Sequence, residues 1–169
     1  IDAIGDDITL ESRDLLMGLQ AEYEAMEPKM QRFVKNYSKL NDALLAYQAI
    51  VDKNAADAVQ KQIDSIKDMG ELTLDNEETI RGIRADYDAL TTNQKILVDA
   101  TALLDAEAKI KALRQVRIDH LKELITQISS PVTLADEPVI TEAMEIYEWM
   151  YMDERQQIDY ETLLAANTA

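Results

Sequence analysis

A single histidine is the first candidate for acid–base chemistry in this sequence. His120 is the only His among 169 residues and lies in a charged stretch, residues 119–123. A Ser-His-Asp relay needs a nucleophile beside the ring, and no nucleophile motif flanks His120. One histidine also argues against a His-rich metal site. We therefore interpret His120 as a surface or helix-flank residue; the alternative is a general base.

Adjacent acidic residues are the second candidate, because two carboxylates can bind Ca²⁺ or act as acid and base. The pairs are Asp6-Asp7, Glu77-Glu78, Asp136-Glu137 and Asp153-Glu154. The spaced acidic ligands and central Gly of a calcium loop are absent. Most pairs fall near predicted helix starts, where the helix dipole stabilises negative charge. We expect them to cap helices, and the sequence predicts no metal site and no catalytic residue.

Composition excludes several other kinds of chemistry. The chain has no Cys, so disulfides, thiolate catalysis and Cys-based zinc sites are ruled out. Neither GxGxxG nor GxxxxGK[ST] occurs, so no cofactor is predicted. The net charge of −16 repels nucleic acids and anionic membrane surfaces. No apolar run is long enough to insert into a bilayer.

The elements that carry these residues are predicted to be helices throughout. Ala, Leu, Glu, Lys and Gln are abundant and favour helices. Only 4 Gly and 3 Pro are present, too few for a turn-rich β fold. Hydrophobic residues make up 47% of the chain, enough for a folded core. We therefore predict an all-α fold.

An internal repeat organises the helices. Ile8-Thr9-Leu10, Leu72-Thr73-Leu74 and Val132-Thr133-Leu134 are related by offsets of 64 and 60 residues. Apolar and tyrosine positions keep these offsets as the sets Leu16/Ile80/Ile140, Leu19/Ile83/Ala143, Tyr23/Tyr87/Tyr147, Met26/Leu90/Met150, Val34/Val98/Ile158 and Leu40/Leu104/Leu164. The first four sets are three or four residues apart, which is the buried stripe of an amphipathic helix. The spacing predicts helices over about 12–26, 76–90 and 137–150.

Local signals predict how these helices begin. Asp75 and Glu78 have the spacing of a capping box at the start of the second one. Pro138 falls in the first turn of the third, where proline is tolerated. Pro28, and Thr91 with Gln94, are expected to start the next helix of the first and second repeats.

Two segments between repeats contain no helix breaker. The apolar spacing from Leu40 to Ile66 predicts one unbroken helix over 39–67, and the same pattern runs from Leu103 to Ile128. We expect tandem three-helix-bundle repeats joined by continuous shared helices, forming an elongated array. The repeats are 1–50, 51–112 and 113–169, with the first helix of repeat 1 truncated. Apolar surface on the rest of repeat 1 would then be exposed, and an oligomer contact is one way to cover it.

The second repeat resembles a known family. The residues that carry the likeness are Leu72-Thr73-Leu74-Asp75, Ile80, the run 84–91 (RADYDALT), Gln94-Lys95, Leu97-Val98 and Ala106-Glu107. They are similar to a three-helix-bundle repeat of large cell-surface proteins of Gram-positive (Firmicutes-type) bacteria. The resemblance is good over 63–113 and weaker elsewhere. It implies an extracellular location at the bacterial cell surface, neighbouring domains of the same larger protein as partners, and no catalytic residue.

Large apolar residues break the repeat at one place. Trp149, Tyr151 and Met152 stand where the first two repeats have Ala, Glu or Thr, and Pro or Thr. Aromatic and Met side chains are enriched at protein interfaces, so these three form a candidate interaction patch. The alternative is local repacking of the core of repeat 3.

Three functional hypotheses remain open at this point. The first is a non-enzymatic structural and interaction module, a helical spacer or stalk segment. The second is an adhesive module that recognises a host protein or a glycan through the Trp149 patch. The third is an intracellular helical adaptor.

Overall fold

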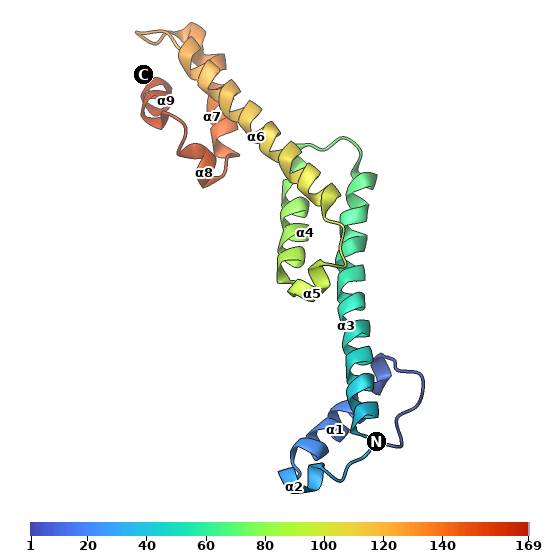
Figure 1. Cartoon of the computed structure of the whole chain (residues 1–169). Coiled ribbons are helices and arrows are strands. Elements are labelled where there is room, and N and C mark those ends of the chain that lie inside the picture. Colours follow the sequence, from blue (N-terminus) through green and yellow to red (C-terminus); the bar gives the residue numbers. More distant parts are fainter. Residues whose placement is uncertain (169) are drawn as a thin grey trace. The chain divides into compact units, whose positions relative to one another are not determined.

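The computed structural model describes residues 1–168, and every regular element in this range is a helix (Figure 1). The predicted all-α fold class is therefore confirmed. Helix formers dominate the composition, and Gly70 and Pro131 lie in two of the interruptions.

One local order of elements occurs three times along the chain. A 3₁₀ turn leads into a helix of 12 or 13 residues, and a four-residue helix follows. We refer to residues 9–31, 73–95 and 133–155 as the first, second and third motifs. Their elements are η1 (Leu10–Ser12), α1 (Arg13–Glu24) and α2 (Pro28–Gln31); η3 (Leu74–Asn76), α4 (Glu77–Ala89) and α5 (Thr92–Lys95); and η4 (Leu134–Asp136), α7 (Glu137–Glu148) and α8 (Met152–Arg155). The three predicted helices over 12–26, 76–90 and 137–150 are thus observed.

Pro138 lies in the first turn of α7, as predicted, but the start of the second motif differs from the predicted cap. The capping box of the second motif joins Thr73 to Asn76, with Thr73 N–H donating to Asn76 Oδ1 at 2.9 Å. The predicted box between Asp75 and Glu78 is therefore wrong. Because a 3₁₀ turn precedes the α-helix, the first N–H groups that need acceptors lie two residues earlier than the apolar stripe indicates.

The third helix of each repeat was predicted to run on from Pro28 or Thr91, and it does not. α2 ends at Gln31, and the long helix α3 (Tyr37–Ser65) begins after a break. Phe33, which lies in this break, is 76% exposed. The capping box of Thr91 with Gln94 is confirmed, at distances of 3.0 and 3.3 Å.

The last residue of each short helix gives the physical reason for the break. Gln31 Nε2 donates to Tyr23 O at 3.0 Å, Lys95 Nζ to Asp88 O at 2.9 Å, and Arg155 Nε to Tyr147 O at 3.0 Å. Each donor reaches a carbonyl at the end of the preceding helix. Tyr23 O and Tyr147 O also accept a backbone N–H from the following turn, from Met26 and Met150, at 3.2 Å. The short helix is thereby held across the end of the longer one, and the chain must turn again before the next helix.

Both predicted long helices are present. α3 has 29 residues and α6 (Thr101–Gln127) has 27, so α3 is about 43 Å long. η2 (Ile66–Met69) follows α3, and Gly70 then adopts φ +70°, a left-handed conformation that favours glycine and ends the helical run. The last helix is α9 (Tyr160–Asn167).

One aligned set of leucines needs correction. Leu40, Leu103 and Leu163 are fully buried, whereas Leu104 is 56% exposed and Leu164 is 42% exposed. Leu40 and Leu103 are 63 residues apart, one fewer than the offset of 64 that the preceding positions keep. The connection to the long helix is one residue shorter after the second and third motifs than after the first.

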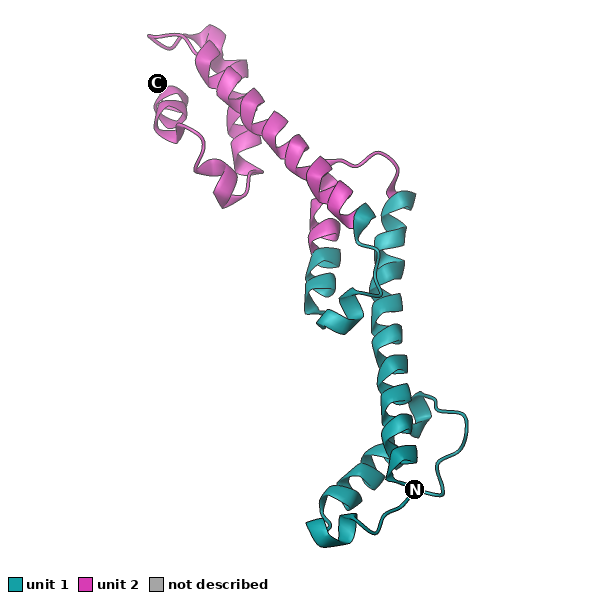
Figure 2. Ribbon diagram, in the orientation of Figure 1, with its two compact units in different colours: residues 1–68, 82–102 teal, residues 69–81, 103–169 magenta. Residues whose placement is uncertain are grey.

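The chain divides into two units, residues 1–68 with 82–102 and residues 69–81 with 103–169 (Figure 2). The core of the first unit gathers Ile4, Leu16, Leu40, Ala43 and Tyr47. The core of the second gathers Ile118, Leu121, Leu124, Ala143, Met150, Ile158 and Leu163. Each core combines side chains of one motif with side chains of the long helix that packs on it. Leucine and isoleucine are the most frequent residues in the two cores.

Candidate functional site

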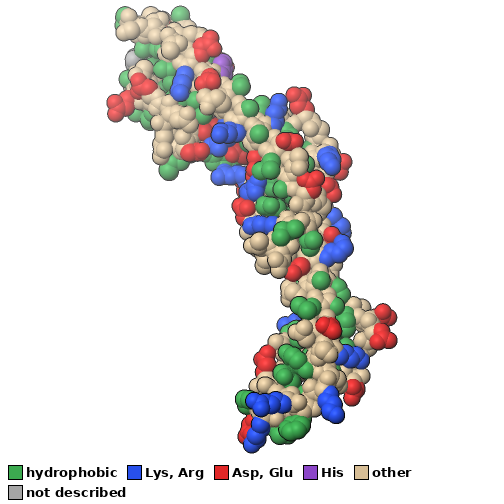
Figure 3. All heavy atoms as spheres, viewed as in Figure 1, with side chains coloured by type: hydrophobic (Ala, Val, Ile, Leu, Met, Phe, Trp, Pro, Cys, Tyr) green, Lys and Arg blue, Asp and Glu red, His purple; other side chains and the backbone are tan. Residues whose placement is uncertain are grey.

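His120 lies at the surface of the second unit (Figure 3), as the sequence predicted. Its side chain is 47% exposed, and its Nε2 lies 3.0 Å from Glu142 Oε1. Both residues belong to helices, α6 and α7, so the contact ties two exposed helix flanks together. An exposed pair of this kind contributes little to stability.

Asp136 has the capping role predicted for the acidic pairs. Its carboxylate accepts from Thr133 N–H at 2.7 Å, Thr133 Oγ1 at 2.9 Å, Ser129 Oγ at 2.8 Å and Ser129 N–H at 3.1 Å. The backbone hydrogen bond from Thr133, followed by the bonds from Ser129, lowers the pKa of Asp136 from 3.8 to about 2. Hydrogen bonds to the charged form explain the direction of this pKa shift.

Glu154 also caps a helix, α8, and it has a second role that the sequence reasoning missed. Its side chain is only 2% exposed and meets two arginines from α6, Arg114 and Arg117. Arg117 Nη2 lies 2.6 Å and Arg117 Nε 3.2 Å from Glu154 Oε1, and Tyr151 N–H donates to Glu154 Oε2 at 2.9 Å. Burial acts to raise the pKa of Glu154, but the hydrogen bonds from Arg117 and Tyr151 outweigh it, and the pKa is lowered.

Arg114 extends this group toward the surface and toward α4. Its Nη2 donates to both carboxylate oxygens of Asp153 at 2.8 Å, and its Nη1 lies 3.8 Å from Glu77 Oε1. Its Nε is buried, lies 3.4 Å from Glu154 Oε1 and makes no hydrogen bond. The forked guanidinium therefore spans three carboxylates, a geometry that lysine does not offer.

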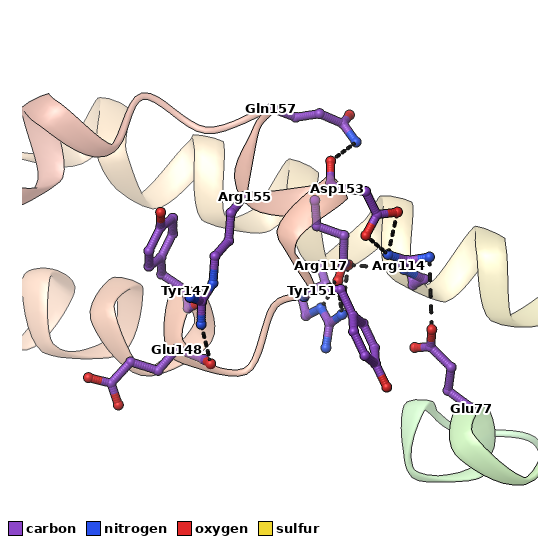
Figure 4. Close-up of polar contacts among 10 residues, drawn as sticks. Glu77, Arg114, Arg117, Tyr147, Glu148, Tyr151, Asp153, Arg155 and Gln157 are labelled. Carbon is purple, nitrogen blue, oxygen red and sulfur yellow. Dashed lines mark hydrogen bonds and ion pairs between the residues drawn. The ribbon is translucent and has the colours of Figure 1, made fainter. Parts of the chain in front are cut away.

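Tyr151 covers the same group with its ring. The guanidinium carbons of Arg81 and Arg114 lie 4.8 and 5.3 Å from the ring centroid. Figure 4 shows Tyr151 beside Arg114 and Arg117. We call Glu77, Arg81, Arg114, Arg117, Tyr151, Asp153 and Glu154 the arginine cluster. It fastens the short helix α8 to α6.

A gap in the apolar spacing of α6 was the signal for this cluster. The stripe steps from Leu113 to Leu121, and Val116 is the apolar residue between them with a helical spacing to Leu113. Val116 is 65% exposed. The position four residues from each leucine is Arg117, whose side chain is only 15% exposed. A charged residue at a buried position of a helical stripe indicates a buried acidic partner.

The candidate patch separates into two environments. Trp149 is 81% exposed and Met152 is 78% exposed, whereas Tyr151 is 36% exposed and belongs to the arginine cluster. Between them Met150 enters the core and is 4% exposed. Trp149 and Met152 therefore do not fill space in the core of the second unit, and the exposed part of the patch consists of these two side chains.

Two observations bear on other kinds of site within residues 1–168. No group of three or more His, Asp or Glu side chains is placed to hold a metal ion in this part of the chain. Over the same residues, no helix combines the length and the apolar character needed to cross a membrane.

Comparisons of the chain with protein-family models, with curated protein sequences and with solved structures found no match.

Proposed function

We propose that this chain is a non-enzymatic helical spacer, a segment of a bacterial cell-surface protein built from tandem three-helix repeats that share their long helices. The observation that carries the proposal is that one helix, α3, packs with two motifs in succession. The resemblance of residues 72–107 to repeats of surface proteins supports the location.

The first half of α3 packs against the first motif. Leu40, Ala43 and Tyr47 are buried in one core with Leu16 of α1. The second half meets the second motif and the segment after it through polar contacts: Asp52 Oδ1 accepts from Gln94 Nε2 at 2.9 Å, and Gln60 Oε1 accepts from Asp99 N–H at 2.7 Å. α3 is therefore held at both ends by different parts of the chain.

Sharing of this kind supports a mechanical role. An unbroken helix transmits the position of one packed group to the next, because bending it requires breaking backbone hydrogen bonds or losing packing at one end. A flexible linker of equal length would keep no fixed separation between its ends. The spacer function needs only this stiffness.

The test measures the stiffness of α3 directly. The chain has no Cys, so spin labels can be attached to cysteines introduced at Ser38 and Lys61, both exposed on α3. We expect one narrow distance distribution near about 35 Å, from about 1.5 Å per residue. Asn54→Pro should broaden it, because proline in a helix interior removes a hydrogen bond and clashes with the preceding turn. Asn54→Ala should not.

A broad distribution in the unsubstituted background would overturn the spacer proposal. Small-angle X-ray scattering of the whole chain gives an independent measurement. An elongated profile supports a spacer, and a globular profile contradicts it.

A second candidate function is the adhesive module, favoured by the exposure of Trp149 and Met152. Such a module would bind a host protein or a glycan through these side chains. Binding of the labelled chain to a glycan array should then be lost in Trp149→Ala and kept in Leu164→Ala, which removes an exposed apolar side chain elsewhere in the second unit. Equal signals from both variants would contradict it.

A further inference from the structure

The corner where α7 meets α8 in the third motif is an exposed apolar surface. Trp149 follows the last residue of α7 and Met152 begins α8, and both side chains are exposed. The corresponding positions are also exposed in the other two motifs, as Ala25 and Pro28 in the first and as Ala89 and Thr92 in the second. The second motif lies between the other two along the chain, so the repeat places no segment of its own over this corner.

Two acidic residues of α7 lie beside Trp149. Glu145 is one helical turn before Trp149, Glu148 is the residue next to it, and both are exposed. The first two motifs have Ala21 and Ala85 where the third has Glu145. The third motif therefore adds a carboxylate and an indole to the same turn of the helix.

Glu148 lacks the side-chain partner that its counterparts have. In the first two motifs a polar residue four positions earlier binds the corresponding carboxylate. The pairs are Gln20 with Glu24, at 2.8 Å, and Arg84 with Asp88, at 3.5 Å. The third motif has Met144 at this position, which packs on the core. Within residues 1–168, no hydrogen bond or ion pair holds the carboxylate of Glu145 or of Glu148.

The one basic residue of this region is already bound elsewhere. Residues 132–169 contain nine Asp and Glu but a single Lys or Arg, which is Arg155. Arg155 Nε donates to Tyr147 O at 3.0 Å, and its Nη2 donates to Glu148 O at 2.6 Å. Figure 4 shows Arg155 directed at the backbone of Glu148, whose carboxylate points away from it. Arg155 therefore does not neutralise the acidic side chains beside Trp149.

We propose that the corner of Trp149 and Met152 binds an arginine of a basic protein segment. The guanidinium lies on the face of the indole, which attracts cations, and pairs with Glu145 or Glu148. Arginine suits this corner better than lysine, because a planar guanidinium stacks on a ring and bonds a carboxylate with two N–H groups. Met152 offers apolar surface to the methylene groups of the arginine. The inference names a partner class for the adhesive candidate function and rests on it, but it does not rest on the spacer function.

Charge distinguishes this partner from two other occupants of an exposed aromatic surface. A second copy of the chain would bring the same acidic residues to the corner, and like charges oppose such a contact. A neutral glycan stacks on an aromatic ring without using the charges of Glu145 and Glu148. A basic segment uses both the ring and the charges.

The experiment uses the emission of Trp149, the only Trp in the chain, as the binding signal. The whole chain is titrated with a peptide in which Arg alternates with Ser, and with a matched peptide in which citrulline, a neutral isostere, replaces Arg. We expect the Arg peptide to shift the emission to the blue and to bind at least about tenfold more tightly than the citrulline peptide.

Two double variants with the same change in net charge locate the binding. Glu145→Gln with Glu148→Gln should weaken binding of the Arg peptide about tenfold, because it removes the charges beside Trp149. Asp6→Asn with Asp7→Asn removes two exposed charges from the first unit and should leave the affinity within about twofold, since charges outside the contact are screened by salt. Circular dichroism confirms that both variants keep their helices.

Three results would overturn the inference. One is equal binding of the two peptides. Another is an equal loss of affinity in the two double variants, which would show that the net charge of the chain attracts the peptide. The third is no response to the Arg peptide together with glycan-array binding that Trp149→Ala abolishes. That third result would leave the adhesive function standing with a glycan as its ligand, whereas no response in either assay would remove both.

Discussion

Arg117 and Glu154 are 37 residues apart in the sequence and form a buried, two-point ion pair, with Arg117 Nη2 2.6 Å and Nε 3.2 Å from Glu154 Oε1. Glu154 also accepts the backbone N–H of Tyr151, which starts the short helix α8. One carboxylate therefore caps α8 and attaches it to α6. In the second motif Gln94 has the same two contacts, with Thr91 and with Asp52.

Removing the charge of Glu154 should destabilise the second unit strongly. Glu154→Gln leaves the guanidinium of Arg117 buried without a counter-ion, which costs about 3 kcal/mol in comparable pairs. Urea denaturation followed by circular dichroism measures the loss. Asp153→Asn is the matched control, because Asp153 contacts Arg114 with a side chain that is 69% exposed. A loss in the control equal to that in Glu154→Gln would show that burial does not set the effect.

Replacing both members of the pair should restore most of that stability. The double variant Arg117→Met with Glu154→Leu fills the space with apolar atoms and buries no unpaired charge. We expect its urea midpoint to lie closer to that of the unsubstituted chain than to that of Glu154→Gln. A double variant as unstable as the sum of its single variants would contradict this account.

Asp136 should give the fold a defined sensitivity to acid. Its pKa falls from 3.8 to about 2 in the folded chain, chiefly through the backbone hydrogen bond from Thr133. A lowered pKa means that the carboxylate stabilises the fold above pH 3.8, and that this contribution is lost as the pH falls toward 2. Asp136→Asn removes the titrating carboxylate but keeps a side-chain oxygen that can accept from Thr133 N–H. Asn76 Oδ1 accepts from Thr73 N–H in this way in the second motif.

Comparing the unsubstituted chain with Asp136→Asn isolates the titration of Asp136, because both proteins contain all the other carboxylates. The difference in unfolding free energy between the unsubstituted chain and Asp136→Asn should be constant above pH 5 and shrink toward zero near pH 2, the window set by the pKa of Asp136. Urea midpoints measured across this range test it. A difference that stays constant down to pH 2 would mean that the carboxylate is not specially stabilised.

The residue that ends each short helix should tolerate exchange for another donor only. Lys95 Nζ donates to Asp88 O, as Gln31 Nε2 donates to Tyr23 O in the first motif. Lys95→Met should therefore cost about 1 kcal/mol, the net value of one such hydrogen bond, whereas Lys95→Gln should cost less than half of that. Thermal unfolding of both variants provides the comparison, and equal losses would assign the effect to the charge of Lys95 instead.

Periodicity was sufficient to predict the helices, because a stripe of apolar residues depends only on the helical repeat. The long helices α3 and α6 and the three helices α1, α4 and α7 all follow from it. It failed at the short helices. Phe33 and Leu97 continue the apolar spacing, yet they are 76% and 55% exposed, because donors such as Lys95 hold the short helix across the preceding one. The acceptor of the hydrogen bond from Lys95 is a backbone carbonyl, so a pattern of side-chain types does not reveal this contact.

The candidate site was predicted only in part, for a related reason. Trp149 and Met152 stood out because the aligned positions hold small or polar residues, and both are exposed. The pairing of Arg117 with Glu154 was missed, because Arg117 alone resembles a surface charge and Glu154 alone resembles a capping residue, and only the fold brings them together. The interrupted stripe between Leu113 and Leu121 was the one trace of this pair in the sequence. A basic residue at such an interruption should therefore be considered as a partner for each acidic residue of the motif that follows in the sequence.

The fluorescence of Trp149 should report an aromatic side chain in water. It is the only Trp in the chain and is 81% exposed, so we expect red-shifted emission, ready quenching by acrylamide, and little further shift in urea. The same signal then detects any partner that covers Trp149, because burial shifts the emission to the blue. Met152→Ala removes the exposed neighbour on α8 and should leave the emission of the free chain unchanged. Blue-shifted, protected emission that persists on dilution would show that Trp149 is buried within a single chain, and the patch of Trp149 and Met152 would then be withdrawn as an interaction surface.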